Sequence, residues 1–337
     1  MKVGIGPRFI AISAVLITAV FVVFMTTAKA EDDVKLSLEW LISGRHVGFF
    51  VAKEKGYYKE EGLNVAIERG YGTADSIKRI STGSADFAIL SVASLIAAKA
   101  ESNPPVMLVA SFFNKGPETI LVLRSSKIRS PKDLAGKRIG SASAGSSLDL
   151  LKAFAKTTQL EGYQSVLMAS DQTYPALLTK QVDAITGFTD NAAVMRPIAQ
   201  RQGDDIEIMP YSDYGVDNYG TGIVVNSKLA QSKSPKIRGF LRASLRGIAW
   251  SLKNPEEAVA ILKKHVPTMS TDIALATWKI DEKLISTSET KKHGLGYLSK
   301  ERMAVTYDMA QKYMGVTKPL SLENVYTAEF IPRIDVP

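Results

Sequence analysis

The chain of 337 residues is predicted to be an α/β protein built from two similar lobes. From Val34 onward, short β-rich runs alternate with helical stretches, which is typical of a sheet of parallel strands covered by helices. The same order of elements recurs in a second series. With 45% apolar and 23% charged residues, the composition is that of an ordinary globular protein and supplies enough chain for two packed cores.

The first series occupies residues 31–121 and forms the first part of the first lobe. Its strands are expected at 34–40, 64–68, 86–90 and 106–112, and its helices at 46–57, 73–82 and 92–101. A first crossing between the lobes is expected near 118–123.

The second series occupies residues 122–220 and forms the second lobe. A short helix begins it, because Ser130, Pro131 and Asp133 have the spacing of an N-cap, a first helical proline and an acidic third position. Strands are expected at 137–141, 165–169, 183–187 and 206–209, and helices at 146–158, 173–180 and 190–200.

The two series can be superimposed by sequence. Residues 82–89 (TGSADFAI) and 179–186 (TKQVDAIT) each contain a helix end, a short turn, an aspartate and an apolar strand. The alternative is that any α/β protein contains such units, but the recurrence of the whole order favours two lobes of one architecture.

Residues 221–337 are expected to return to the first lobe through a second crossing near 220–225 and then to become mainly helical. Asn254 and Pro255, followed by two glutamates, mark a helix start. Trp250 and Trp278 are expected in the core. Ligands of open α/β sheets bind beyond the carboxyl ends of the strands, so two facing lobes predict a binding cleft between them, with the crossings as a hinge.

Residues 1–30 have the layout of a secretory signal peptide. Lys2 and Arg8 precede an apolar run, and Ala28 and Ala30 provide a small-residue cleavage site before Glu31. Cleavage after Ala30 would place the mature chain in the periplasm; the alternative is a retained membrane anchor. Without these residues the net charge falls from +8 to +5. This excess is modest and forms no long basic run, so nucleic-acid binding is not expected.

The residue types needed for most catalytic chemistry are scarce. The chain has no cysteine and three histidines, none at metal-ligand spacing from another, so we expect no metal and no cofactor. No phosphate-binding loop, nucleophile elbow or zinc-protease motif occurs, and an enzyme is not expected.

Binding features follow the predicted strands. Trp40 offers an indole face and His46 an imidazole near the end of the first strand, Tyr71 lies between two glycines after the second, and a Ser/Gly loop follows the first strand of the second series. The structural alternatives are a core tryptophan, a helix-capping histidine and simple tight turns. The candidate ligand-binding residues are Trp40, Ser43, Gly44, His46, Tyr71, Gly72, Ser91, Ser143, Gly145, Ser146, Phe188, Thr189, Asp190 and Tyr219.

Several of these segments resemble a known family. Leu-Glu-Trp at 38–40, His46 and FFVAKEKGYYKEEGL at 49–63 resemble the opening of the periplasmic binding proteins of the nitrate/sulfonate/taurine and thiamine-pyrimidine (NMT1/THI5-like) class. Residues 83–87, 130–140 and 182–184 are similar as well. The resemblance implies a type II two-lobed binding protein that delivers a solute to an ABC permease, and a monomer.

The family also contains thiamine-pyrimidine synthases, which use a donor histidine and a cysteine-rich iron motif. This chain has no cysteine, and 91–96 contain no histidine where that donor would fall. The resemblance therefore favours transport over synthesis. The Trp40–His46 spacing resembles the pyrimidine-handling members and implies a stacked heterocycle; the alternative ligand is an alkanesulfonate, taurine or nitrate anion held by the 143–147 loop.

Overall fold

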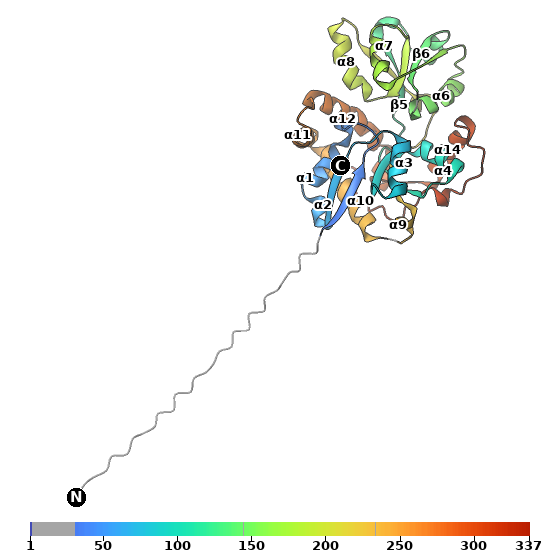
Figure 1. Ribbon diagram of the computed structural model, residues 1–337. Helices are drawn as coiled ribbons and strands as arrows, with labels where there is room; N and C mark the ends of the chain where they lie inside the picture. The colour runs from blue at the N-terminus through green and yellow to red at the C-terminus, as the bar shows by residue number, and fades with distance from the viewer. Residues whose placement is uncertain (2–30, 144, 233) are drawn as a thin grey trace. The chain divides into compact units, whose positions relative to one another are not determined.

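The structure is a computed structural model that describes Met1 and residues 31–143, 145–232 and 234–337. The predicted signal segment therefore lies outside the described residues, apart from its first methionine. In these ranges no helix combines the length and the apolar character needed to cross a membrane. Figure 1 shows the strands and helices of the folded part, residues 31–337, in chain order.

The first lobe contains a five-stranded mixed sheet in the order β2-β1-β3-β10-β4. Strands β1 and β2 pair in parallel, as do β1 and β3, whereas β10 runs antiparallel to both of its neighbours. The strands are β1 (Asp32–Ser37), β2 (Leu63–Glu68), β3 (Phe87–Ser91), β4 (Val106–Ser111) and β10 (Thr221–Asn226). The predicted sheet is thus confirmed as a core of parallel strands to which one returning strand adds an antiparallel partner.

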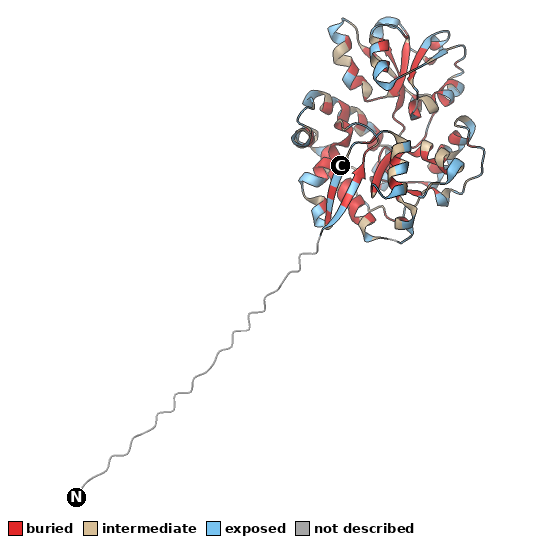
Figure 2. Ribbon diagram, in the orientation of Figure 1, coloured by how far each residue is buried: buried red, intermediate tan, exposed pale blue. Residues whose placement is uncertain are grey.

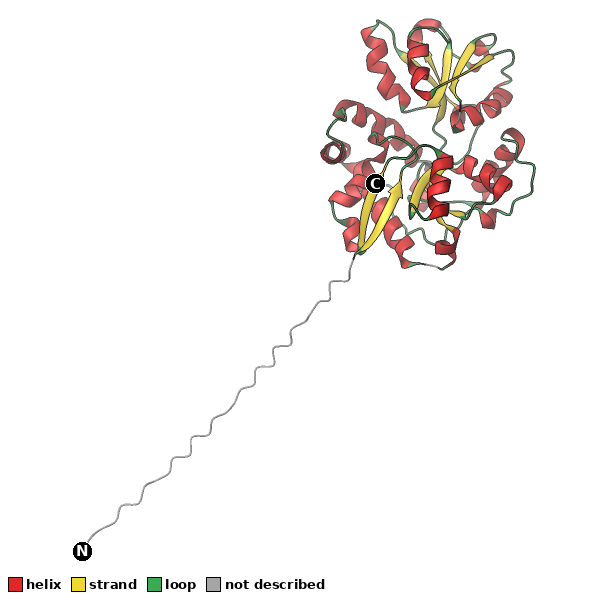
Figure 3. Cartoon of the chain, in the orientation of Figure 1, coloured by secondary structure: helices red, strands yellow, loops and turns green. Residues whose placement is uncertain are grey.

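The second lobe repeats this order as β7-β6-β8-β5-β9, with β5 as its antiparallel member. Its strands are β5 (Glu118–Leu123), β6 (Arg138–Ala142), β7 (Gln164–Met168), β8 (Ala184–Phe188) and β9 (Ile206–Pro210). Each lobe therefore has four strands of its own series and one strand contributed by a crossing, and Figure 3 shows both sheets in yellow between their helices.

The aspartates that relate the two series by sequence make equivalent hydrogen bonds. The backbone N–H of Lys35 in β1 donates to Asp86 Oδ2 at 2.9 Å, and that of Arg138 in β6 donates to Asp183 Oδ2 at 2.8 Å. In both lobes a carboxylate before the third strand of the series thus satisfies a backbone donor of the first strand. The repeat is a repeat of hydrogen bonding as well as of element order.

Helices cover the faces of both sheets (Figure 1). Those of the first series are α1 (Val47–Glu54), α2 (Tyr57–Glu60), α3 (Thr73–Thr82) and α4 (Val92–Ser102); those of the second are α5 (Ser146–Asp149), α6 (Leu151–Thr158), α7 (Thr173–Leu178) and α8 (Asn191–Arg201). The helix expected at 46–57 ends early because Gly56 adopts a left-handed φ of 76° between α1 and α2. The helix expected at 146–158 is divided in two at Leu150.

The C-terminal helices follow β10 of the first-lobe sheet. They are α9 (Ser227–Gln231), α10 (Pro235–Lys253), α11 (Pro255–His265), α12 (Thr271–Ile285), α13 (Ser288–His293) and α14 (Lys300–Tyr313). Of these helices, α10 packs against α1. Trp278 is fully buried, whereas Trp250 is half-buried with Lys55 Nζ 3.9 Å from its ring centroid. Figure 2 shows the buried segments of the folded part in red.

The two crossings differ from the expectation. Residues 118–123 and 221–226 are paired strands, β5 and β10, so their backbone hydrogen bonds are already used within the sheets. The segments that connect the sheets are 112–117 and 215–220, and a 121/122 boundary would fall inside β5. The two connections lie side by side, because Gly220 N–H donates to the Phe113 carbonyl at 3.1 Å.

Candidate binding site between the lobes

Two loops at the carboxyl edge of the first sheet present exposed aromatic side chains. Trp40 follows β1 and is 44% exposed, and Tyr71 follows β2 and is 60% exposed. The loops are joined by backbone hydrogen bonds from Gly70 N–H to the Trp40 carbonyl (3.1 Å) and from Gly72 N–H to the Glu39 carbonyl (2.8 Å). A Cβ at Gly70 would lie 1.7 Å from the Leu38 carbonyl oxygen, so only glycine permits this approach.

The centre of the site is a guanidinium that reaches from one lobe to the other. Arg45, in the single turn η1 (Gly44–His46), is 5% exposed. Its Nε donates to Asp190 Oδ2 at 3.1 Å and its Nη2 lies 2.5 Å from Asp190 Oδ1, which makes a two-pronged ion pair with the second lobe. On the first lobe, Nη1 lies 3.1 Å from Glu39 Oε1.

A further carboxylate, Asp281 of α12, is fully buried beside this pair. Its Oδ2 lies 3.7 Å from Arg45 Nε, and neither of its carboxyl oxygens has a hydrogen-bond partner among the described residues. We call Glu39, Arg45, His46, Asp190 and Asp281 the inter-lobe charge cluster. The cluster brings one guanidinium, three carboxyl groups and an imidazole together from segments far apart in the sequence.

Burial and charge set the protonation of the cluster. Burial raises the pKa of Asp281 well above its ordinary value, and the nearby Asp190 adds to the rise while Arg45 opposes it. Burial would also raise the pKa of Glu39, but His46 and Arg45 outweigh it and lower that pKa to about 2. Glu39 is therefore ionised at neutral pH, whereas Asp281 favours the protonated form.

His46 has no ring nitrogen free for a ligand. The side chain is fully buried; Ser43 N–H donates to Nδ1 at 3.1 Å, and Nε2 lies 3.1 Å from Glu39 Oε2. Both ring nitrogens are therefore engaged, Nδ1 by the Ser43 backbone and Nε2 by the Glu39 carboxyl. The structure thus places His46 as a capping residue that orients Glu39, which was the structural alternative from sequence. Gly44 packs against the backbone of α12, and Ser43 is half-buried.

The loop after β6 is less suited to an anion than its sequence suggests. Ser143 is exposed and donates through Oγ to the Met168 carbonyl at 3.1 Å, Gly145 has a φ of 127°, and Ala144 is not described. The helix that follows, α5, is a single turn with Asp149 in it. Ser146 is buried and hydrogen-bonds Glu118, a carboxyl whose pKa burial raises.

The remaining predicted residues separate into two groups. Phe188 ends β8, Thr189 and Asp190 follow it, and the Arg45 Cζ atom lies 5.5 Å from the Phe188 ring centroid. Ser91 and Tyr219 do not join them. Ser91 caps α4 by accepting from Ser94 N–H, and Tyr219 is buried with its hydroxyl accepting from Ser299 N–H at 2.8 Å.

Sequence reasoning missed Glu39, Arg45, Glu118 and Asp281, and also Phe113, whose ring centroid lies 5.4 Å from the Arg45 Cζ atom. Arg45 lies between two predicted residues and could have been considered from its position alone. Asp281 had no such signal, because it lies on a helix more than 200 residues further along the chain.

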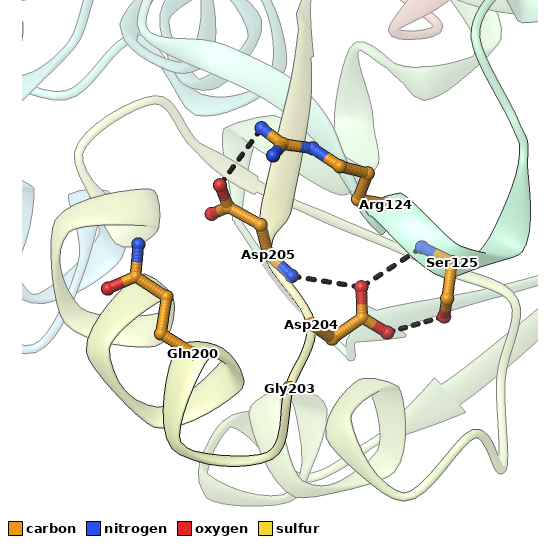
Figure 4. A pocket seen from close by; sticks show the side chains of 6 residues that line it. All are labelled: Arg124, Ser125, Gln200, Gly203, Asp204 and Asp205. Atoms are coloured by element: carbon orange, nitrogen blue, oxygen red, sulfur yellow. Dashed lines mark hydrogen bonds and ion pairs between the residues drawn. The ribbon is translucent and has the colours of Figure 1, made fainter.

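Two surface cavities lie away from this site. One of about 450 Å³ is lined by Arg124, Ser125, Gln200, Gly203, Asp204 and Asp205 (Figure 4). It is at the end of β5 opposite to Glu118, and its charged groups pair internally, Arg124 with Asp205 and Asp204 with Ser125. The other, of about 310 Å³, adjoins α12 and the C-terminus. Within the described ranges, no three acidic or histidine side chains are grouped to hold a metal ion.

The fold is that of two-lobed periplasmic binding proteins. The aliphatic sulphonate-binding protein SsuA of Escherichia coli superimposes with a TM-score of 0.68 at 15% identity, covering 90% of this chain and 94% of that one. The nitrate-binding protein NrtA of Synechocystis superimposes with a TM-score of 0.66 at 13% identity, covering 89% and 87%. The predicted fold class is thereby confirmed.

Residues 43–258 match the NMT1/THI5-like family, and the chain belongs to that family. Relatives include the formylaminopyrimidine-binding protein of Halalkalibacterium halodurans, 27% identical over 258 residues (74% of this chain, 77% of that protein). The riboflavin-binding protein RibY of Chloroflexus aurantiacus is 26% identical over 321 residues (89% and 86%). A 4-amino-5-hydroxymethyl-2-methylpyrimidine phosphate synthase of Legionella pneumophila is 25% identical over 251 residues (74% and 78%).

Proposed function

We propose that this protein is the periplasmic solute-binding component of an ABC importer and captures a small planar nitrogen heterocycle, of the thiamine-pyrimidine precursor type, between its lobes. The closed protein with its solute would then bind a membrane permease and deliver the solute to it. The family and the two-lobed fold support the general role, and the charge of the inter-lobe site supports the choice of solute.

The observation that carries the proposal is the excess of carboxyl groups over cations at this site. Glu39, Glu118, Asp190 and Asp281 supply four carboxyls, and the guanidinium that lies among them, Arg45, is already paired with Glu39 and Asp190. An anionic solute would meet acceptors and negative charge. A heterocycle with N–H and amino donors would find acceptors that match it.

The exposed aromatic rings provide a second support. Trp40 and Tyr71 stand on adjacent loops at the carboxyl edge of the first sheet, where solutes of such sheets bind. The face of the Trp40 indole can stack on a planar ligand, whereas the Arg69 guanidinium already lies 4.2 Å from the Tyr71 ring centroid. Two relatives are named for binding formylaminopyrimidine and riboflavin, which are both planar nitrogen heterocycles.

The alternative solute is a small anion, as in the sulfonate- and nitrate-binding proteins of the same fold. It is less well supported, because the 143–147 loop leads into one helical turn that carries Asp149 and because Ser146 is bound to Glu118. A synthase activity, as in the Legionella relative, is also less well supported. The chain has no cysteine, His46 has both ring nitrogens occupied, and His265 pairs with Glu54 on the surface.

Thermal unfolding of the mature protein tests the proposal. The panel is 4-amino-5-hydroxymethyl-2-methylpyrimidine, formylaminopyrimidine, thiamine, riboflavin, taurine, an alkanesulfonate and nitrate. A solute that binds only the folded protein stabilises it by about 2.7 kcal/mol at 100 times its Kd. We expect a dose-dependent shift with a pyrimidine or flavin, lost in Asp190→Asn and kept in Asp272→Asn, an exposed aspartate of α12. A shift with the anions alone would overturn the choice of solute.

A monomer and a permease partner are part of the same proposal. Light scattering coupled to size exclusion checks the first, and solute-dependent stimulation of a reconstituted permease checks the second.

A further inference from the structure

The Arg45 guanidinium occupies a place that is built to recognise a flat group. The Asp190 carboxylate holds it at two nitrogens, 3.1 Å from Nε and 2.5 Å from Nη2. The Arg45 Cζ atom lies over two aromatic faces, 5.4 Å from the Phe113 ring centroid and 5.5 Å from that of Phe188. We call Asp190, Phe113 and Phe188 the guanidinium seat.

The chemistry of the guanidinium seat is not specific to arginine. A carboxylate that accepts two parallel N–H bonds recognises any planar N–C–N edge with donors on both nitrogens, and aromatic faces favour a flat, electron-poor group above them. An amino-substituted pyrimidine presents such an edge once its ring nitrogen is protonated. Arg45 therefore stands where the solute of the proposed function would find its best polar match.

Asp281 offers Arg45 another partner. Its carboxyl is fully buried 3.7 Å from Arg45 Nε, and both oxygens lack hydrogen bonds among the described residues. An unsatisfied buried polar group destabilises a protein. Asp281 lies on α12 and Glu39 follows β1, both in the first lobe with Arg45, whereas Asp190 lies in the second. Arg45 can therefore leave Asp190 and remain paired within its own lobe.

We infer that the guanidinium seat is the subsite for a planar N–C–N edge of the solute, and that Arg45 fills it until the solute enters and then turns to Asp281. This inference rests on the proposed function. Arg45 would then select between solutes. A solute without such an edge cannot replace the two contacts that Asp190 loses when Arg45 leaves it. The same exchange gives the orphaned Asp281 carboxyl a role.

The exchange of partners predicts a proton signal. The groups that face Asp281 are Arg45 and Glu39 of the first lobe and Asp190 of the second, and burial together with Asp190 raises the pKa of Asp281. Asp281 favours its protonated form while Arg45 is at Asp190, and it ionises when Arg45 turns to it. Solute binding should then release a proton from Asp281.

Isothermal titration calorimetry with 4-amino-5-hydroxymethyl-2-methylpyrimidine and formylaminopyrimidine tests this, in two buffers of different ionisation enthalpy. Protonation of the solute itself cancels in the comparison of wild type with Asp281→Asn. We expect wild type to release about one proton more per solute, and Asp281→Asn to bind about tenfold more weakly. Stability of the solute-free variant in urea should not fall. Asp272→Asn, the matched control on α12, should behave as wild type. Equal affinity and equal proton release in wild type and Asp281→Asn would overturn the inference.

A measurement without solute separates this inference from the proposed function. The chain has no cysteine, so Lys78→Cys in the first lobe and Lys156→Cys in the second accept spin labels specifically. We expect the population with separated lobes to increase in Asp190→Asn, because the pair that joins the lobes is weakened. We expect it to decrease in Asp281→Asn, because Arg45 then lacks the carboxylate of its own lobe that would replace Asp190. If no solute of the panel binds but these shifts appear, the exchange of Arg45 stands and the proposed solute falls. Unchanged distances in Asp281→Asn would overturn the exchange.

Discussion

Removing one partner of the ion pair between Arg45 and Asp190 should destabilise the protein strongly, because the pair is buried and two-pronged. Arg45 and Asp190 are 5% and 6% exposed, and two nitrogen–oxygen contacts of 2.5 and 3.1 Å join them. Arg45→Met leaves the Glu39 and Asp190 carboxyl groups in a buried site without the guanidinium that pairs with them. Breaking a buried pair in this way lowers the free energy of unfolding by about 3–5 kcal/mol.

A double-mutant cycle isolates the pairwise contribution. We expect Arg45→Met and Asp190→Asn, measured singly and together by urea unfolding at pH 7, to give a coupling energy of at least about 1.5 kcal/mol, as for other close charge pairs. The control cycle uses Lys279→Met and Glu256→Gln, a pair 3.3 Å apart whose side chains are 52% and 67% exposed. Its coupling should be below about 1 kcal/mol. Equal couplings in the two cycles would refute the argument that the inter-lobe pair is desolvated and strong.

Three further results are expected. Trp40→Ala should change unfolding by less than about 0.5 kcal/mol, since the side chain is 44% exposed, and should weaken solute binding by about 1–3 kcal/mol in calorimetry; unchanged affinity would exclude stacking. The folded-state pKa of Glu39 is lowered from 4.5 to about 2, so its ionised form should stabilise the protein by about 3 kcal/mol above pH 4.5 and lose this contribution as the pH falls towards 2. The difference in the free energy of unfolding between wild type and Glu39→Gln, measured by urea unfolding, should shrink over that pH range. A difference independent of pH would contradict the assignment. Gly70→Ala places a Cβ 1.7 Å from the Leu38 carbonyl oxygen and should lower stability by at least about 1–3 kcal/mol in urea unfolding, whereas an unchanged midpoint would show that the loop relaxes freely.

The sequence predicted the elements well because their signals are local. The helix at 73–82 begins and ends where the pattern indicated, and the aspartates at 86 and 183 occupy equivalent places in the two lobes. Predicted boundaries failed where a residue's conformation decided them, as at Gly56, whose left-handed φ ends α1. The crossings were misjudged for another reason. Residues 118–123 and 221–226 are apolar runs whose pairing partners are far away in the chain, so only the assembled sheets show that they are strands.

The candidate site divides in the same way. Trp40, Tyr71 and Asp190 could be proposed from sequence because each ends or follows a predicted strand, and parallel strands bring their carboxyl ends to one edge. The sequence by itself therefore determined the family, the two-lobed class and the loops that carry the site. Only the tertiary structure decided which side chains meet there. It paired Arg45 with Asp190 across 145 residues, used up both nitrogens of His46, and brought Asp281 beside them. Burial and mutual charge, which set the protonation of these groups, are properties of neighbours in space and leave no local pattern in the chain.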